Sequence, residues 1–261
     1  MPIRLLYPCS LNDQKQPDEL FAEEYAAVIA AGLESSLFSI EDFELGSFRA
    51  RPRFVPNEHI IYRGWMMSPD QYSDLCSAIE LAYGIPVTTA EQYRKCHYLP
   101  EWFESCKDLT PDTVFCDKNT NFSDVLSKKG WPKCFVKDYV KSLTTSRGSI
   151  ANSSLEILEI IQLIENHRGG IEGGISLRQY ESFDPETEER YFVFEGQPYA
   201  KDGKIPEIVN KITTRINSRF YSVDIAAHTD GTLRLIEIGD GQVSDLKGWN
   251  VHDFVQLFKS N

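Results

Sequence analysis

The chain has 261 residues, of which 41% are hydrophobic and 25% are charged, proportions typical of a globular protein with a sizeable core. Its 39 acidic and 27 basic residues give a net charge of −12, which argues against nucleic acid or an anionic membrane as the main partner. The six cysteines form no Cys-x-x-Cys pair and no apolar run reaches the roughly 20 residues of a membrane helix, so we expect free thiols in a cytoplasmic protein.

In the first hundred residues, short apolar runs alternate with helical patterns, which is the rhythm of an α/β domain. One of the helices opens with Ser68 and Pro69, a pair typical of helix starts. A more irregular stretch over residues 97–130 indicates a connection with short helices, and we place a domain boundary in it at residue 108. We expect strands at residues 3–7, 36–40, 59–65 and 85–88, and helices at residues 19–31 and 68–83.

From residue 131 onward the pattern changes to longer strands and hairpins, which predicts an α+β domain with antiparallel strands. We therefore divide the chain into a domain at residues 1–108 and a second domain at residues 109–261. We expect strands at residues 134–141, 174–180 and 191–194, a hairpin at residues 220–239, and helices at residues 153–166 and 206–216.

The strand predicted after residue 133 carries lysines inside an apolar pattern. Strand alternation places Lys137 and Lys141 on one face. Burial of an unpaired ammonium is costly, so an anion is expected nearby. The loop that follows begins at Ser142, is rich in hydroxyl groups and contains Arg147, which suits it to bind phosphates. The alternative is a solvated edge strand protected by its lysines and followed by an ordinary polar loop.

Two further strands are joined by an acidic turn that favours a nucleotide. Exposed backbone where the first strand ends, near Gln179 and Tyr180, can bind the edge of an adenine. Glu189 on the next strand can accept hydrogen bonds from ribose hydroxyls, while Arg190 points from the opposite face and can clamp a transferred phosphoryl group. An ordinary surface pair of glutamate and arginine is the alternative.

The predicted hairpin brings two acids together. If Asp230-Gly231 is a two-residue turn, Thr229 lies opposite Thr232, and counting outward places Asp224 opposite Glu237. Directly paired side chains of a β-ladder are close, and like charges there repel. A cation is therefore expected between the two carboxylates.

Mg²⁺ suits this pair, because it commonly takes one or two carboxylates together with waters and substrate phosphates. A third acid, Asp240, follows on the same strand. The alternative is a half-exposed hairpin whose acids only face solvent.

The order of these features resembles the ATP-grasp superfamily of carboxylate–amine ligases over residues 131–244. The resemblance assigns Lys137, with Lys141 as a second candidate, to the phosphates of ATP. It assigns the adenine-binding hinge to residues 178–180 and the metal-binding hairpin to Asp224 and Glu237. It also implies an α/β pre-ATP-grasp domain in the N-terminal half, followed by an α+β ATP-grasp domain with antiparallel sheets.

The chain departs from the family pattern at Gly239, where the resemblance implies an asparagine. Either Asp240 takes this role after a local bulge, or a water does. The additional phosphate lysine of the family is not assigned, and Lys95, Lys107 and Lys133 are all candidates. In the front half, Arg63 is a candidate for binding a substrate carboxylate or for a structural salt bridge, and His97 for a core residue or a catalytic one.

The resemblance implies an ATP- and Mg²⁺-dependent ligase that joins a carboxylate to an amine through an acyl phosphate. In this interpretation Lys137 and Arg190 neutralise the transferred phosphoryl group, and Lys141, Ser142, Gln179, Tyr180 and Glu189 bind ATP. The acceptors are small-molecule, peptide or protein carboxylates and amines. A phosphotransferase, a non-catalytic ATP-binding protein and a metal-dependent hydrolase remain alternatives.

Overall fold

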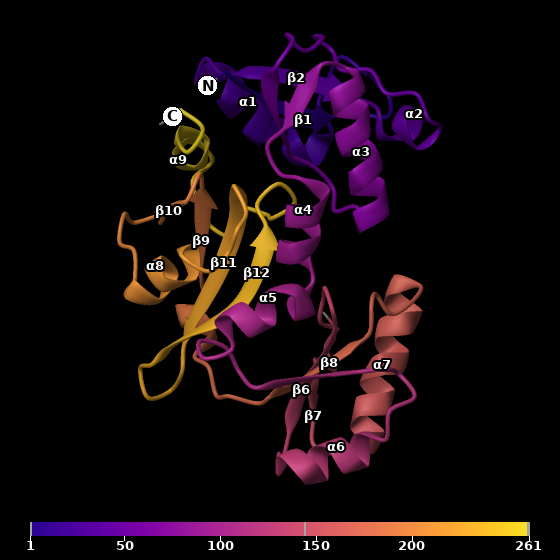
Figure 1. Cartoon of the computed structure of the whole chain (residues 1–261), viewed down its shortest axis with the longest axis vertical. Helices are drawn as coiled ribbons and strands as arrows, with labels where there is room; N and C mark the ends of the chain where they lie inside the picture. The colour runs from indigo at the N-terminus through magenta and orange to yellow at the C-terminus, as the bar shows by residue number, and fades with distance from the viewer. Residues whose placement is uncertain (1, 144, 260–261) are drawn as a thin grey trace. The chain divides into compact units, whose positions relative to one another are not determined.

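The computed structural model describes residues 2–143 and 145–259. Contacts divide the chain into two compact units, each assembled from segments that are distant in the sequence (Figure 1). Unit 1 comprises Met1–Cys96, Glu189–Val223 and Gly239–Asn261, and unit 2 comprises His97–Glu188 and Asp224–Ile238. The boundary at residue 108 stays a prediction.

Unit 1 begins with a parallel four-stranded sheet in the order β2-β1-β3-β4 (Figure 1). The predicted alternation of strands and helices is confirmed, with element ends displaced by a few residues. The helix at Pro69 starts with a capping box between Ser68 and Gln71, as its Ser-Pro start indicates. The elements are β1 (Ile3–Pro8), η1 (Glu19–Phe21), α1 (Ala22–Ala30), β2 (Glu34–Phe38), α2 (Ile40–Glu44), β3 (Glu58–Tyr62), α3 (Pro69–Leu81), β4 (Gly84–Pro86) and α4 (Ala90–His97).

Both faces of this parallel sheet are buried. Leu5 and Ile61 belong to one hydrophobic cluster, whereas their neighbours Leu6 and Ile60 belong to another, which includes Leu75 of α3. Successive side chains of a strand point to opposite faces, so each strand contributes to both clusters. This arrangement explains why the strands of the front half have nearly continuous apolar sequences.

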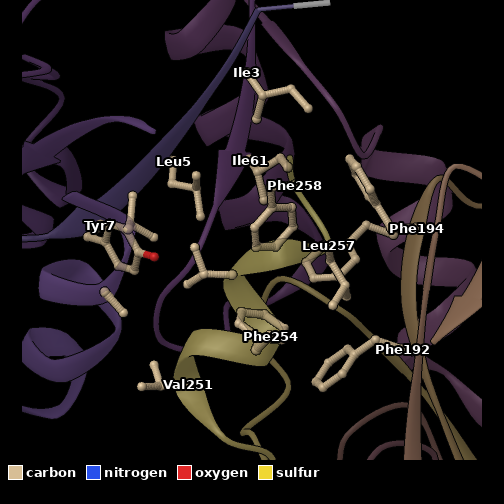
Figure 2. Packing of buried hydrophobic residues seen from close by; sticks show 14 of the residues in the cluster. Ile3, Leu5, Tyr7, Ile61, Phe192, Phe194, Val251, Phe254, Leu257 and Phe258 are labelled. Carbon is tan, nitrogen blue, oxygen red and sulfur yellow. The ribbon is translucent and has the colours of Figure 1, made fainter. Parts of the chain in front are cut away.

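A second sheet has the order β10-β9-β11-β12. Its aromatic side chains pack against the C-terminal helix, and Figure 2 shows Phe192 beside Phe254 and Phe258 in the cluster that also contains Leu5. The rings of Phe192 and Phe254 have their centroids 4.8 Å apart, in an edge-to-face arrangement that aromatic pairs favour. The elements are β9 (Glu189–Phe194), β10 (Gln197–Tyr199), α8 (Glu207–Thr213), β11 (Phe220–Ala227), β12 (Leu233–Asp240) and α9 (Val251–Gln256).

Unit 2 contains an antiparallel sheet in the order β5-β8-β6-β7. Helix α7 buries Ile157, Ile160 and Ile164 in one cluster with Val136 and Leu177 of the sheet, the spacing of an amphipathic helix. At 15 residues, α7 is longer than α3, and no helix in residues 2–143 and 145–259 is long and apolar enough to cross a membrane. The elements are α5 (Leu99–Cys106), β5 (Thr113–Cys116), α6 (Phe122–Lys129), β6 (Cys134–Asp138), β7 (Ile150–Ala151), α7 (Ser154–Arg168), β8 (Ile175–Gln179) and η2 (Pro185–Thr187).

All six cysteines are free and buried, as the sequence predicts. Burial raises the pKa of the Cys76 and Cys134 thiols to about 11. These two thiols therefore stay protonated at neutral pH, where the thiolate is the reactive form.

Candidate active site

The buried lysine of β6 contacts an acid of the predicted metal hairpin. Lys137 Nζ donates a hydrogen bond to Glu237 Oε1 at 2.6 Å. The lysine side chain is 6% exposed, whereas the glutamate side chain is 39% exposed. The anion expected beside Lys137 is therefore a carboxylate of the protein, and it is open to solvent.

Arg178 is a second buried cation in the same unit. Its position on β8 is opposite Phe135 of β6, and its Nη1 and Nη2 atoms donate to Ile236 O at 2.8 Å and to Thr110 Oγ1 at 2.6 Å. Among the described residues its buried Nε atom has no hydrogen-bond partner. Burial lowers the pKa of Arg178 to about 10, and the nearby Glu237 carboxylate opposes that shift.

Sequence reasoning placed Arg178 only in the hinge and missed its contact with the hairpin. The signal that could have found it is a cationic side chain within an apolar strand, the argument already applied to Lys137. The two cations come from neighbouring strands, because β6 and β8 are paired.

His97 is buried and its electrostatic environment is shared with the lysines. Burial lowers the pKa of His97 to about 4; the charges of Lys141 and Lys137 lower it further, and that of Glu237 opposes them. The imidazole is therefore neutral at pH 7. This environment agrees with the core role weighed for His97 from the sequence.

Strand β6 ends at Asp138, so the strand predicted over residues 134–141 is too long. The Asp138 Oδ1 atom accepts hydrogen bonds from the backbone N–H groups of Val140 at 2.8 Å and Lys141 at 2.6 Å. These bonds turn the chain. The prediction that Lys137 and Lys141 share one strand face is consequently wrong, although both charges act on His97.

The hydroxyl-rich loop joins β6 to β7. Ser142 forms an isolated antiparallel bridge with Lys137, and the Ser149 hydroxyl accepts the backbone N–H of Leu143 at 3.0 Å. Arg147 pairs with Glu156 and Glu159 of α7, both at 3.2 Å, so its charge is already matched. Thr144, which belongs to this predicted loop, lies outside the described residues.

The predicted adenine hinge follows β8 directly. The backbone N–H of Gln179 donates to Asp112 O at 2.7 Å, and β8 ends at this residue. Lys133 Nζ lies 3.6 Å from the centroid of the Tyr180 ring, a cation–π contact. Lys133 is one of the candidates for the additional phosphate lysine.

The predicted hairpin is present, but its turn has three residues. Gly231 N–H donates to His228 O, and His228 N–H donates to Thr232 O, both at 2.8 Å. The expected pairing of Thr229 with Thr232 is therefore wrong. Gly231 has φ 87°, a conformation that glycine adopts without strain.

The hairpin also contains an irregularity within β12. At the open end, Gly241 N–H donates to Phe220 O at 3.2 Å. From His228 to Phe220 the first strand advances 8 residues, whereas from Thr232 to Gly241 the second advances 9. Strand β12 thus has one extra residue, which is a β-bulge. The extra residue falls in the part of β12 that carries Glu237.

Gly239 has no room for a side chain. A Cβ atom there would lie 2.8 Å from Ser222 Oγ and 3.0 Å from Ser244 Oγ. The two hydroxyls are themselves hydrogen bonded at 2.8 Å. Packing therefore explains why glycine occupies the position where the family resemblance implies asparagine.

Asp224 and Asp240 are buried, unlike Glu237. Asp224 is 3% exposed and Asp240 is fully buried. The Asp240 Oδ1 atom accepts from the Gln242 backbone N–H and side chain, but Oδ2 has no hydrogen-bond partner in the described part of the chain. Burial raises the pKa of Asp240 to about 7. No group of three or more His, Cys, Asp or Glu side chains is placed to hold a metal within the described residues.

The predicted ribose and phosphoryl residues of β9 both have protein partners. Glu189 accepts from Tyr191 Oη at 2.8 Å and pairs with Lys201 at 3.2 Å. Arg190 pairs with Asp245 at 2.7 Å. Their roles, like those of the other predicted site residues, stay predictions.

Comparisons with known proteins agree with the resemblance in the sequence. Residues 83–259 match the model of a family described as an ATP-grasp domain, family 3 of its clade. No curated protein sequence matches this chain.

Solved structures of low sequence identity share the fold. The D-cycloserine synthetase DcsG is 13% identical, with 98% of each chain covered and a TM-score of 0.65. The ATP-grasp ligase PsnB complexed with a minimal precursor is 12% identical, with 100% of this chain and 99% of that chain covered and a TM-score of 0.63. The D-alanine-D-alanine ligase from Coxiella burnetii is 12% identical, with 98% and 94% covered and a TM-score of 0.63.

Proposed function

The chain belongs to this ATP-grasp domain family, and on this premise we propose that it is an ATP-dependent ligase that joins a carboxylate to an amine. The γ-phosphoryl group of ATP is transferred to the carboxylate, and the amine then displaces phosphate from the resulting acyl phosphate. Such a reaction needs no nucleophile from the protein, and catalysis comes from positioning and electrostatics. The structures of similar fold are themselves described as ligases or a synthetase.

The contact between Lys137 and Glu237 is the observation that carries this proposal. A buried ammonium held by a partly exposed carboxylate can exchange that partner for a phosphate oxygen at little cost. We assign Lys137 to the phosphates of ATP, with Lys141 and Ser142 in the turn and loop that follow. Arg190 is assigned to the transferred phosphoryl group, whose charge it would neutralise.

The adenosine part of ATP is assigned to the end of β8 and the start of β9. The backbone at Gln179 and Tyr180 would bind the adenine edge, and the carboxylate of Glu189 would accept hydrogen bonds from ribose hydroxyls. The exposed Gln179 side chain at the strand end supports this assignment, because it leaves the neighbouring backbone accessible.

Mg²⁺ is proposed as the metal, with Asp224, Glu237 and Asp240 as its ligands. Carboxylate oxygens suit this hard cation, and the unpartnered Oδ2 atom of Asp240 fits a ligand role. Gly239 supplies no ligand, and its packing excludes one. When bound, Mg²⁺ neutralises phosphate charge. Lys137 keeps the Glu237 side chain in one place, which orients that carboxylate in advance.

We further propose that residues 1–108 form a pre-ATP-grasp domain that helps to bind the acceptor, with residues 109–261 as the ATP-grasp domain, in a cytoplasmic enzyme. The parallel sheet of β1 to β4 supports an α/β domain at the front of the chain. The acceptors are small-molecule, peptide or protein carboxylates and amines.

Titration of the protein with ATP and Mg²⁺ by calorimetry tests the nucleotide site. We expect the Lys137→Met variant to lose measurable binding, and the Lys211→Met variant, which removes only an exposed ion pair of α8, to bind like the wild type. Ligase chemistry is tested by incubation with ATP, a pool of carboxylic acids and hydroxylamine, which converts an acyl phosphate into a hydroxamate. Unchanged ATP affinity of Lys137→Met would remove this lysine from the site, and ATP-dependent hydroxamate that persists in that variant would place the chemistry elsewhere.

The packing at Gly239 favours one second candidate, a non-catalytic ATP-binding protein. The asparagine that the family resemblance implies cannot be accommodated there, so nucleotide binding without turnover follows naturally. This candidate predicts ATP binding with no release of phosphate or ADP above background in the presence of acids and amines. A phosphotransferase, in contrast, releases ADP together with a phosphorylated product and no free phosphate.

A further inference from the structure

A basic cavity lies on unit 1, in the part of the chain that follows β2. Its volume is about 760 Å³, and three of its nine lining residues are arginines: Arg49, Arg51 and Arg53. The remaining lining residues are apolar or aromatic, including Phe48 and Tyr83, and none is acidic. Three positive charges in one hollow are unusual for a chain whose net charge is −12.

The backbone that carries these arginines is held against the edge strand of the parallel sheet. Arg51 N–H donates to Leu37 O, and Leu37 N–H donates to Arg51 O, both at 2.8 Å. The hydroxyl of Ser36 also donates to Pro52 O at 2.7 Å. The segment is therefore fixed before any ligand arrives, which lowers the entropy lost on binding.

Two of the three guanidinium groups are available to a ligand. Arg51 donates to Gln14 Oε1. Arg49 and Arg53 are exposed, and within the described residues neither makes a hydrogen bond or an ion pair. Arginine binds carboxylates through two parallel hydrogen bonds, so groups in this state favour a carboxylate partner.

The cavity also has exposed apolar surface at its rim. Tyr83, which lines it, is 73% exposed, and Leu81 and Val55 beside lining residues are 83% and 59% exposed. Large exposed apolar side chains grouped around charged ones are typical of interaction sites. A ligand that combines negative charges with apolar side chains satisfies both features.

We propose that this cavity binds an acidic peptide segment of a partner protein. The arginines stand at every second residue, and along an extended chain alternate side chains are about 6.6 Å apart. An extended peptide with Asp or Glu at alternate positions and apolar residues between them has the same repeat. The proposal goes beyond the ligase reaction, because none of these residues is assigned to ATP, metal or phosphoryl transfer.

Fluorescence anisotropy with the full chain tests the proposal. The probe is a labelled peptide that alternates Glu and Leu, measured at about 50 mM salt, where exposed charges are weakly screened. We expect the wild type to bind it and Arg49→Glu/Arg53→Glu to bind it about tenfold or more weakly. Lys128→Glu/Lys204→Glu is the matched control, since it changes the net charge equally at exposed lysines, and its affinity should equal that of the wild type.

Thermal unfolding shows whether the arginine variant is folded, and Arg49→Gln/Arg53→Gln repeats the measurement without introducing negative charges. The proposal is overturned if the wild type does not bind the peptide, or if both arginine variants bind it as tightly as the wild type. It is equally overturned if inorganic pyrophosphate or a single-stranded oligonucleotide of the same charge displaces the peptide at lower concentrations than the unlabelled peptide does.

Discussion

The ammonium of Lys137 and the carboxylate of Glu237, which are 100 residues apart in the sequence, are joined by a hydrogen bond of 2.6 Å. The lysine is buried and the glutamate is partly open to solvent. A buried cation needs an anion, but this anion can be replaced by a ligand without unfolding the strand that carries the lysine. The pair therefore connects the stability of unit 2 with the proposed nucleotide site.

Replacement of Lys137 by methionine should separate stability from function. Because an apolar side chain of similar length removes the desolvated charge, we expect the free energy of unfolding to stay within about 1 kcal/mol of the wild type. Glu237→Gln leaves the ammonium without a counter-charge and should cost about 1–2 kcal/mol, a value reduced by the exposure of the glutamate. Urea unfolding of both variants provides the measurement.

The ordering of the two variants is the decisive outcome of that experiment. A Lys137→Met variant that is several kcal/mol less stable than Glu237→Gln would show that the lysine contributes to packing in a way that its charge does not explain. ATP titration of the same samples then distinguishes a folded protein without a nucleotide site from a damaged one.

Local signals in the sequence were sufficient for many elements. The start of α3 at Ser68 and Pro69, the α/β rhythm of the first half and the existence of the hairpin all depend on residues close in the chain. Strand β5 was not predicted, because its place is set by pairing with β8, in which Thr113 lies opposite Arg178. A pairing over such a sequence distance leaves no local periodicity to detect.

The candidate site was predictable only in part, for the same reason. Lys137 stood out because a lysine in an apolar strand is unusual, whereas the end of β6 at Asp138 depends on which backbone groups that side chain accepts. The bulge of β12 and the three-residue turn also escaped the sequence, since an Asp-Gly pair is compatible with turns of different length. Register errors of one residue arise in this way.

His97 should make stability depend on pH on the acidic side. Its pKa falls from 6.5 to about 4 on folding because the ring is buried, so the unfolded chain binds more protons between these values. The contribution is complete above pH 6.5 and is lost as the pH falls through 4, up to about 3 kcal/mol. In His97→Gln this loss should disappear from urea unfolding measured at pH 7 and pH 4.5, whereas the exposed His252→Gln should behave like the wild type.

Asp240 should act in the opposite direction over an overlapping range. Burial raises its pKa from 3.8 to about 7, so the folded chain holds a proton that the unfolded chain has released. This stabilising contribution is complete below pH 3.8 and is lost as the pH rises through 7. We expect the stability of Asp240→Asn relative to the wild type to increase by up to about 4 kcal/mol between pH 4 and pH 8.

The same variant examines the proposed metal role of Asp240. A cation bound at its carboxylate would favour the ionised form, so saturating Mg²⁺ and ATP should reduce the advantage of Asp240→Asn at pH 8. Thermal unfolding with and without these ligands provides the comparison. An advantage that does not change on their addition would argue against Asp240 as a ligand.

Gly239→Asn restores the residue that the family resemblance implies, yet we expect it to destabilise the protein. Its Cβ atom would lie within 3.0 Å of the hydroxyls of Ser222 and Ser244, which would have to move apart. Overpacking of this kind costs about 1–3 kcal/mol, and urea unfolding should show a loss in that range. In a Ser244→Ala background the new side chain meets one hydroxyl fewer, so the loss should be smaller. An equal loss in both backgrounds would mean that the contact with Ser244 does not limit this position, and that the glycine is required for the bulged backbone of β12.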